Sequence, residues 1–238
     1  MYAFEYHRPS SVDEAARLLA KSEDVSAIAG GQTLLQTLKQ RLAQPSDLVD
    51  LGGLAELSGI EARKDALVVG AMTRHNEVAR SQDVAKSIPA LAHLAQSIGD
   101  PQVRNAGTLG GSIANNDPAS DYPAGLLGLG ATVTTNKREI AADDFFVDLF
   151  ETALEPGELI QSVRFPVPKR AAYVKFPQPA SRFALVGVMV AETPDGVRVA
   201  VTGAGPCVFR VREMEQALAR DYGPDAVSGV KIDPSWMN

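Results

Sequence analysis

The chain has 238 residues, 45% hydrophobic and 22% charged, which is ordinary for a folded protein long enough to bury a sizeable core. Its net charge of −6 argues against a nucleic-acid-binding face, and no apolar run reaches the length of a membrane span. The single cysteine, Cys207, excludes an internal disulfide and an iron–sulfur cluster held by this chain. The three histidines, His7, His75 and His93, lack the spacing of metal ligands.

Residues 1–53 predict a β-α-β-α-β unit. Alternating aromatic residues near the N-terminus indicate a strand, and SSVDEAARLLAK predicts a helix in which Ser11 and Glu14 form a capping box. VSAIAGG is typical of a short buried strand that ends in a glycine turn. TLLQTLKQRL carries leucines at helical spacing, and DLVDL predicts a further strand.

Residues 54–170 predict a second unit that mixes strands and helices. ALVVGAMT indicates a strand, RHNEVARS and IPALAHLAQSIG indicate helices, and AGLLGLGATVTT indicates a helix followed by a strand. ELIQSVRFPVP predicts a strand that prolines close. This order is not a strict alternation, so the fold class that we predict is α+β.

Residues 171–238 predict a third unit. AAYVKF, FALVGVMVAE and GVRVAVTGAG indicate three strands, and PDG is a hairpin signal between the last two. FRVREMEQALAR predicts a helix after them.

Two glycine-rich stretches carry the strongest functional signal: IAGGQTLLQTLKQRL at 28–42 and RNAGTLGGSIANNDPASD at 104–121. Backbone N–H groups at a glycine turn before a helix can hold anionic oxygens, and a neighbouring hydroxyl adds a donor. The residues that fit this description are Gly30, Gly31, Gln32 and Thr33 in the first stretch, and Thr108, Gly110, Gly111 and Ser112 in the second. Two facing cradles would hold the two phosphates of a dinucleotide.

A glycine pair between a strand and a helix is, however, often only a turn. Two such stretches with hydroxyl neighbours leave the structural and the binding interpretation open. The sequence has no P-loop, no ordinary Rossmann fingerprint and no nucleophile elbow. The residues by themselves therefore indicate a site for a diphosphate or a similar anion, with a dinucleotide among the candidates.

The stretches AGGQTLLQTLKQRLAQPSDLVDL and RNAGTLGGSIANNDPASDYPAGLLGLGATV resemble the FAD-binding medium subunit of the molybdenum hydroxylases. That family includes carbon monoxide dehydrogenase, xanthine dehydrogenase-like enzymes and related aldehyde dehydrogenases. ELIQSVRFP and VTGAG extend the resemblance over nearly the whole chain. It implies a vanillyl-alcohol-oxidase or PCMH-type fold, in which two α/β subdomains, 1–53 and 54–170, clasp FAD. A C-terminal α+β domain, 171–238, is expected to be shorter than in the family.

The resemblance also implies a function and partners. In the family, a large subunit oxidises substrate at a molybdenum–pterin cofactor, and a small subunit with two [2Fe-2S] clusters passes the electrons to FAD in the medium subunit. An external acceptor then takes them. The resemblance implies a dimer of heterotrimers in the cytoplasm, or in the periplasm only with a partner's export signal. The alternatives are a self-sufficient flavin oxidoreductase of the same fold and an assembly subunit without FAD.

Matched position by position, the resemblance assigns cofactor contacts in the two motifs to Ala29, Gly30, Gly31, Gln32, Thr33, Thr108, Leu109, Gly110, Gly111 and Ser112. It assigns Asp121 a hydrogen bond to the cofactor and places Ile98 against the flavin. It implies that the backbone of Ile160 faces the isoalloxazine ring. Lys175 is expected near the flavin, where a cation stabilises the reduced, anionic form.

Without the resemblance, Asp121 would be interpreted as a helix N-cap and Ile98 as a helix-core residue. Ile160 would be a buried strand residue, and Lys175 a solvated charge. No catalytic acid, base or nucleophile is expected, because the flavin carries the redox chemistry. His75 and His93 are expected to be packing or surface residues, and Cys207 a small buried residue. A Gly110→Val substitution is expected to block the diphosphate and remove FAD while the fold persists.

Overall fold

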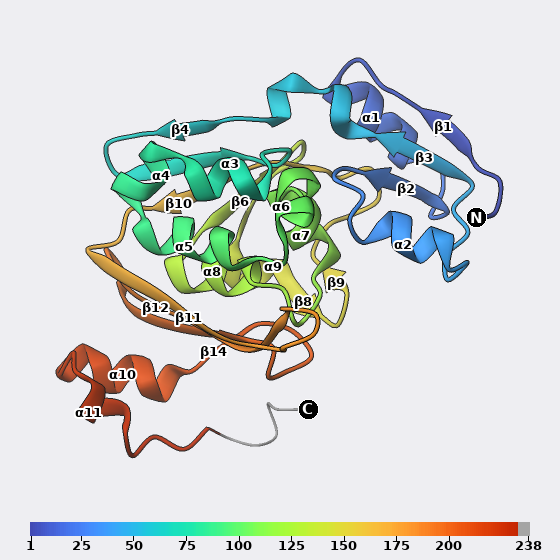
Figure 1. Ribbon diagram of the computed structural model, residues 1–238. Helices are drawn as coiled ribbons and strands as arrows, with labels where there is room; N and C mark the ends of the chain where they lie inside the picture. Colours follow the sequence, from blue (N-terminus) through green and yellow to red (C-terminus); the bar gives the residue numbers. More distant parts are fainter. Residues whose placement is uncertain (233–238) are drawn as a thin grey trace.

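The structure is a computed structural model that describes residues 1–232 (Figure 1). Its N-terminal unit is a parallel sheet in the order β1-β3-β2, with β3 paired to both neighbours. Two helices connect the strands. The elements are β1 (Glu5–His7), α1 (Val12–Leu19), β2 (Val25–Ile28), α2 (Leu34–Lys39) and β3 (Asp47–Asp50).

The start of α1 shows how local sequence fixes this unit. Ser11 is the N-cap, and its hydroxyl accepts a hydrogen bond from the backbone N–H of Glu14 at 3.2 Å, as the capping-box pattern predicts. The carboxylate of Glu14 turns back to the backbone N–H of Ser10 at 2.8 Å, one residue before the expected partner. The box is therefore displaced, although the helix begins where expected.

The second unit is an antiparallel sheet in the order β4-β5-β10-β6-β7. Two short 3-10 helices, η1 (Leu51–Gly53) and η2 (Ala55–Leu57), lead into it. Its strands are β4 (Ile60–Ala62), β5 (Ala66–Gly70), β6 (Thr132–Thr135), β7 (Glu139–Ala141) and β10 (Ile160–Pro166). The helices that accompany it are α3 (His75–Arg80), α4 (Gln82–Ser87), α5 (Pro89–Ser97), α6 (Pro101–Ala106), α7 (Leu109–Asn115), α8 (Tyr122–Leu129) and α9 (Ala142–Phe145). A separate hairpin consists of β8 (Phe146–Asp148) and β9 (Glu151–Thr152).

The third unit is an antiparallel sheet in the order β11-β12-β13-β14. Its elements are β11 (Arg170–Pro177), β12 (Ala184–Thr193), β13 (Gly196–Thr202), β14 (Phe209–Arg210), α10 (Arg212–Arg220) and α11 (Pro224–Val227). Thr193 pairs with Gly196, so the PDG signal marks the β12–β13 turn as predicted. The expected α+β class is confirmed.

Helix α8 joins the second and third units. Every one of its residues is buried, because the helix packs against α5 on one side and against β12 and β13 on the other (Figure 1). Gly128 permits the close approach to the third sheet, since a Cβ there would lie 2.5 Å from Cγ of Met189. The main hydrophobic core accordingly runs from the second sheet through α8 into the third. The domain boundaries at residues 53 and 170 stay a prediction.

Within residues 1–232, no helix combines the length and the apolar character that crossing a membrane requires.

Candidate functional site

The two glycine motifs, far apart in sequence, lie directly against each other. A Cβ on Gly30 would come within 2.1 Å of the carbonyl oxygen of Ala106 and 2.7 Å of Cα of Gly107. A Cβ on Gly111 would lie 3.6 Å from Cβ of Ala29. The end of β2 and the α6–α7 connection therefore form one site, and glycine at position 30 is what allows the backbones to meet.

The first motif leaves a row of backbone donors open. Gly31 has a φ of 69°, a left-handed conformation that turns the chain from β2 towards α2. Within the described residues, the backbone N–H groups of Gly30, Gly31, Gln32 and Thr33 have no protein acceptor. Thr33 precedes α2, is exposed, and makes no capping hydrogen bond with its side chain. Successive N–H groups around a left-handed residue form an anion-binding concavity.

The second motif uses the backbone donors of residues 109–112 inside the protein. The N–H of Leu109 donates to the carbonyl of Thr73 at 3.0 Å, and that of Gly110 donates to the carbonyl of Ala71 at 2.8 Å. The N–H of Gly111 donates to the hydroxyl oxygen of Thr108, the N-cap of α7, at 3.2 Å. Anion contacts from this motif would therefore come from the hydroxyls of Thr108 and Ser112 and from the backbone N–H of Thr108, which has no protein acceptor within residues 1–232.

Gly110 has a packing role that the sequence did not indicate. A Cβ there would lie 2.6 Å from Cβ of Ala71 and 2.8 Å from its carbonyl oxygen. A larger residue must displace β5 or α7, so Gly110→Val would disturb the fold itself. The expectation that the fold persists in that variant does not agree with this geometry.

Asp121 and Lys175 form a buried ion pair between the second and third units. Lys175 Nζ donates to Asp121 Oδ2 at 2.9 Å and to the carbonyl of Ser97 at 3.2 Å. Tyr173, two residues earlier on β11, donates its hydroxyl to Asp121 Oδ1 at 2.5 Å. Asp121 stands at the N-cap position of α8, but its side chain makes no capping bond. Both oxygens of its carboxylate accept hydrogen bonds from side chains of β11 in the third sheet.

Burial dominates the electrostatics of this cluster. Desolvation raises the pKa of Asp121, and the opposing effects of Lys175 and the Tyr173 hydroxyl only partly offset it. Desolvation also raises the pKa of Tyr173, and the Asp121 charge adds to that rise. Tyr173 is therefore a neutral hydrogen-bond donor at ordinary pH.

A groove of about 630 Å³ lies beside the cluster, and Tyr173, Lys175, Gly99 and Arg104 are among its lining residues. The Arg104 guanidinium donates to the carbonyls of Ile98 at 2.9 Å and Gly99 at 3.1 Å. Ile98 is half-buried at the end of α5 and packs against the main core. The structure thus places Ile98 next to Gly99 and Arg104, which line this groove.

Ile160 lies near the second motif. It begins β10 and is buried, and the carbonyl of the next residue, Gln161, accepts a hydrogen bond from the N–H of Ala71 at 2.9 Å. Ala71 in turn accepts from Gly110. The predicted site residues therefore fall into two adjoining groups, one at the glycine motifs and one around Asp121 and Lys175. Helix α6 contributes to both groups, since its Arg104 lines the groove beside Lys175 and its Ala106 meets Gly30.

Comparison with known proteins identifies the family of this chain. The sequence profile described as the FAD binding domain in molybdopterin dehydrogenase matches residues 2–168. The chain belongs to this family. It is 37% identical over 211 residues to the carbon monoxide dehydrogenase medium chain of Afipia carboxidovorans, covering 85% of this chain and 73% of that one. It is 38% identical over 226 residues to the nicotine 6-hydroxylase medium subunit of Paenarthrobacter nicotinovorans, covering 91% of this chain and 80% of that one.

A solved structure agrees with the sequence comparison. Carbon monoxide dehydrogenase from Hydrogenophaga pseudoflava, in a form lacking the Mo-pyranopterin moiety of its molybdenum cofactor, matches with a TM-score of 0.89 and 36% identity. The match covers 95% of this chain and 84% of that one. The expected family and fold are therefore confirmed, and the chain is a FAD-binding component of an oxidoreductase.

The residues of this FAD-binding chain fit the cofactor. A dinucleotide needs donors for its diphosphate and a backbone that allows close approach. The open N–H groups at 30–33 and the hydroxyls of Thr108 and Ser112 supply donors, and the glycines at 30 and 31 leave the backbone bare. The individual contacts stay a prediction.

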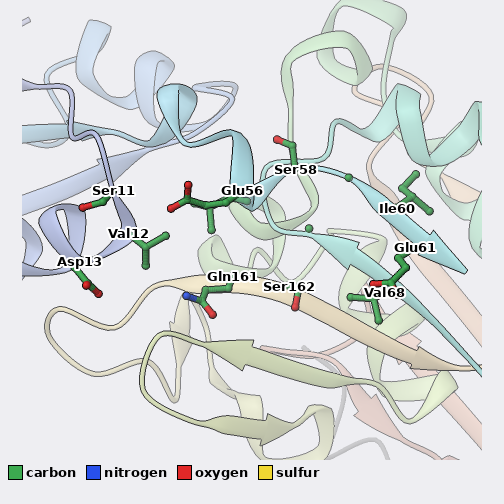
Figure 2. A pocket seen from close by; sticks show the side chains of 13 residues that line it. Ser11, Val12, Asp13, Glu56, Ser58, Ile60, Glu61, Val68, Gln161 and Ser162 are labelled. Atoms are coloured by element: carbon green, nitrogen blue, oxygen red, sulfur yellow. The ribbon is translucent and has the colours of Figure 1, made fainter. Parts of the chain in front are cut away.

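Another groove lies away from these residues (Figure 2). Its volume is about 780 Å³, and its walls come from the start of α1, the η2–β4 segment, β5 and β10. Asp13, Glu56 and Glu61 make its lining acidic, which does not suit a diphosphate. None of the predicted site residues lines it.

The remaining candidates have structural positions. His75 is buried against Gly107 and Tyr122, whereas His93 is exposed. Cys207 is half-buried, and burial raises the pKa of its thiol, which does not favour a reactive thiolate. Sequence reasoning missed Tyr173 and Arg104. The alternation of Tyr173 with Lys175 on one strand was an available signal for the first.

Proposed function

We propose that this chain is the electron-transfer subunit of a heterotrimeric molybdenum hydroxylase. It would receive electrons from [2Fe-2S] clusters of a small partner subunit and pass them through FAD to an external acceptor. A large partner subunit with a molybdenum–pterin cofactor would oxidise the substrate. The observation that carries the proposal is the row of open N–H groups at 30–33, set against the second glycine motif in a chain of this family.

Each group of site residues has a separate task in this proposal. The N–H groups of 30–33 bind the diphosphate, together with the hydroxyls of Thr108 and Ser112. Lys175 holds a positive charge at the groove between the second and third units, where it stabilises negative charge. When bound, FAD supplies the redox chemistry: it accepts electrons from one-electron donors and gives them to the acceptor.

The partners are part of the proposal. The relatives at 37% and 38% identity are named a medium chain and a medium subunit, so each is one component of a larger complex. This chain has one cysteine, so iron–sulfur clusters would be held by another chain. We propose a dimer of heterotrimers as the assembly.

Purification of the chain with its associated subunits tests the proposal. We expect one large and one small partner, a flavin band at about 450 nm over iron–sulfur absorbance, and FAD released on denaturation. In a stopped-flow experiment, chemically reduced clusters should bleach the flavin band within the complex. A chain that binds FAD and turns over alone would be a self-sufficient flavin oxidoreductase. A colourless chain, even with its partners, would be an assembly subunit.

A further inference from the structure

Tyr173 and Lys175 lie on one face of β11 and converge on Asp121. Residues two apart on a strand point to the same side of the sheet. The Tyr173 hydroxyl donates a hydrogen bond to Asp121 Oδ1 at 2.5 Å, and Lys175 Nζ donates to Oδ2 at 2.9 Å. Each carboxylate oxygen therefore has a different partner. Tyr173 is 3% exposed and Asp121 5% exposed, so water does not compete for these contacts.

The third sheet provides a specific space for the Tyr173 hydroxyl. Gly187 pairs with Lys175 across the β11–β12 ladder. A Cβ at Gly187 would lie 2.2 Å from the Tyr173 hydroxyl oxygen and 2.9 Å from Cγ2 of Thr202. Any larger residue at position 187 would therefore push the phenol away from Asp121.

The hydrogen bonds of Lys175 limit where its charge lies. An ammonium group has three donors. One goes to Asp121 and one to the carbonyl of Ser97, which leaves one for the groove that Lys175 lines. The Tyr173 hydroxyl satisfies Oδ1 of Asp121. Without it, both oxygens of a buried carboxylate would depend on the same ammonium group.

We propose that Tyr173 is a positioning residue for the flavin site. By donating to Asp121, it fixes the carboxylate and thereby holds the Lys175 ammonium at the groove wall. This inference rests on the proposed function, because it assumes that the flavin lies near Lys175. Tyr173 itself need not touch the cofactor.

The test measures the midpoint potential of FAD in the purified complex by spectroelectrochemical titration at pH 8, together with FAD content and the thermal midpoint. Tyr173→Phe removes only the hydroxyl. We expect near-normal FAD content and a more negative potential, because the ammonium moves towards Asp121 and stabilises the reduced, anionic flavin less. Tyr222→Phe is the matched control, because the aromatic ring that faces Arg170 is kept. Its potential should equal that of the wild type.

Two further variants make the result decisive. Lys175→Met should make the potential still more negative, because it removes the ammonium charge instead of displacing it. Its shift is the upper limit against which the Tyr173→Phe shift is compared. Gly187→Ala displaces the phenol from the opposite side and should reproduce the Tyr173→Phe shift, so it decides the question if Tyr173→Phe does not fold. Wild-type potentials in Tyr173→Phe and Gly187→Ala would overturn the inference and leave the proposed function standing. A wild-type potential in Lys175→Met would also overturn it. Absence of FAD from the wild-type complex would instead reject the proposed function.

Discussion

The backbone of Gly30 lies directly against the backbone of Ala106. A single carbon added to Gly30 would sit 2.1 Å from the Ala106 carbonyl oxygen, far inside van der Waals contact. Glycine is required here because two backbones meet, whereas Gly31 is required by its left-handed φ of 69°. The two adjacent glycines are thus required for different reasons, Gly30 by close backbone contact and Gly31 by its backbone conformation.

Gly30→Ala should separate the two motifs. The added methyl group meets backbone atoms, which cannot rotate away, so we expect a loss of about 1–3 kcal/mol of stability. We also expect the FAD content to fall well below that of the wild type, since the open N–H groups no longer face the second motif. Absorbance at 450 nm per protein and urea denaturation measure the two effects.

Gly229→Ala is the control for this substitution, because no atom of residues 1–232 lies within 4 Å of a Cβ at that position. It should retain wild-type stability and FAD content. Normal FAD content in Gly30→Ala would mean that the diphosphate is bound away from this contact.

Gly110→Ala should destabilise the protein more than it affects the cofactor. Gly110 is buried, its N–H is bonded to Ala71, and an added Cβ would lie 2.6 Å from Cβ of Ala71. We expect a lower thermal midpoint for both apo and FAD-loaded protein, with about 1–3 kcal/mol lost. FAD titration of the folded fraction should give nearly wild-type affinity. An unchanged thermal midpoint with lost FAD would support the diphosphate role that the sequence indicated.

The glycine motifs show what the sequence could and could not predict. Local signals placed the helices and strands around them, because caps, glycine turns and apolar spacing act within a few residues. The contact between Gly30 and Ala106 depends on long-range packing, for which a single sequence has no local signal. The same holds for Gly110, whose neighbour Ala71 directly follows β5, far from α7 in sequence. Asp121 likewise resembled an N-cap, but its buried partners come from β11.

Thr33→Val should weaken FAD binding without destabilising the fold. Thr33 is exposed and its side chain makes no capping bond, so the apo protein loses nothing when the hydroxyl is replaced. A hydrogen bond to a charged group is worth about 1.5–3 kcal/mol, which corresponds to an increase in Kd of about tenfold or more. Thr37→Val is the control, because that hydroxyl donates to the carbonyl of Thr33 at 3.1 Å within the helix. Equal Kd values for both variants would mean that the Thr33 hydroxyl makes no contact with FAD.

His75 should make the stability of the fold depend on pH in the acid range. Its imidazole is buried beside Gly107, and its Nδ1 has no hydrogen-bond partner within the described residues. Burial, assisted by the charge of Arg104, lowers the pKa of His75 from 6.5 to about 4. Between these values the unfolded chain binds more protons than the folded one, so this contribution to stability is present above pH 6.5 and is lost as the pH falls towards 4.

The His75→Gln variant should lack this part of the pH dependence. Urea denaturation at pH 7 and pH 4.5 should show that the wild type loses up to about 3 kcal/mol more than the variant over this range. Carboxylates titrate in both proteins, so the difference between them isolates His75. His93→Gln, at an exposed position, should follow the wild type. Parallel curves for His75→Gln and the wild type would mean that His75 is protonated as readily in the folded protein as in the unfolded chain, which its burial opposes.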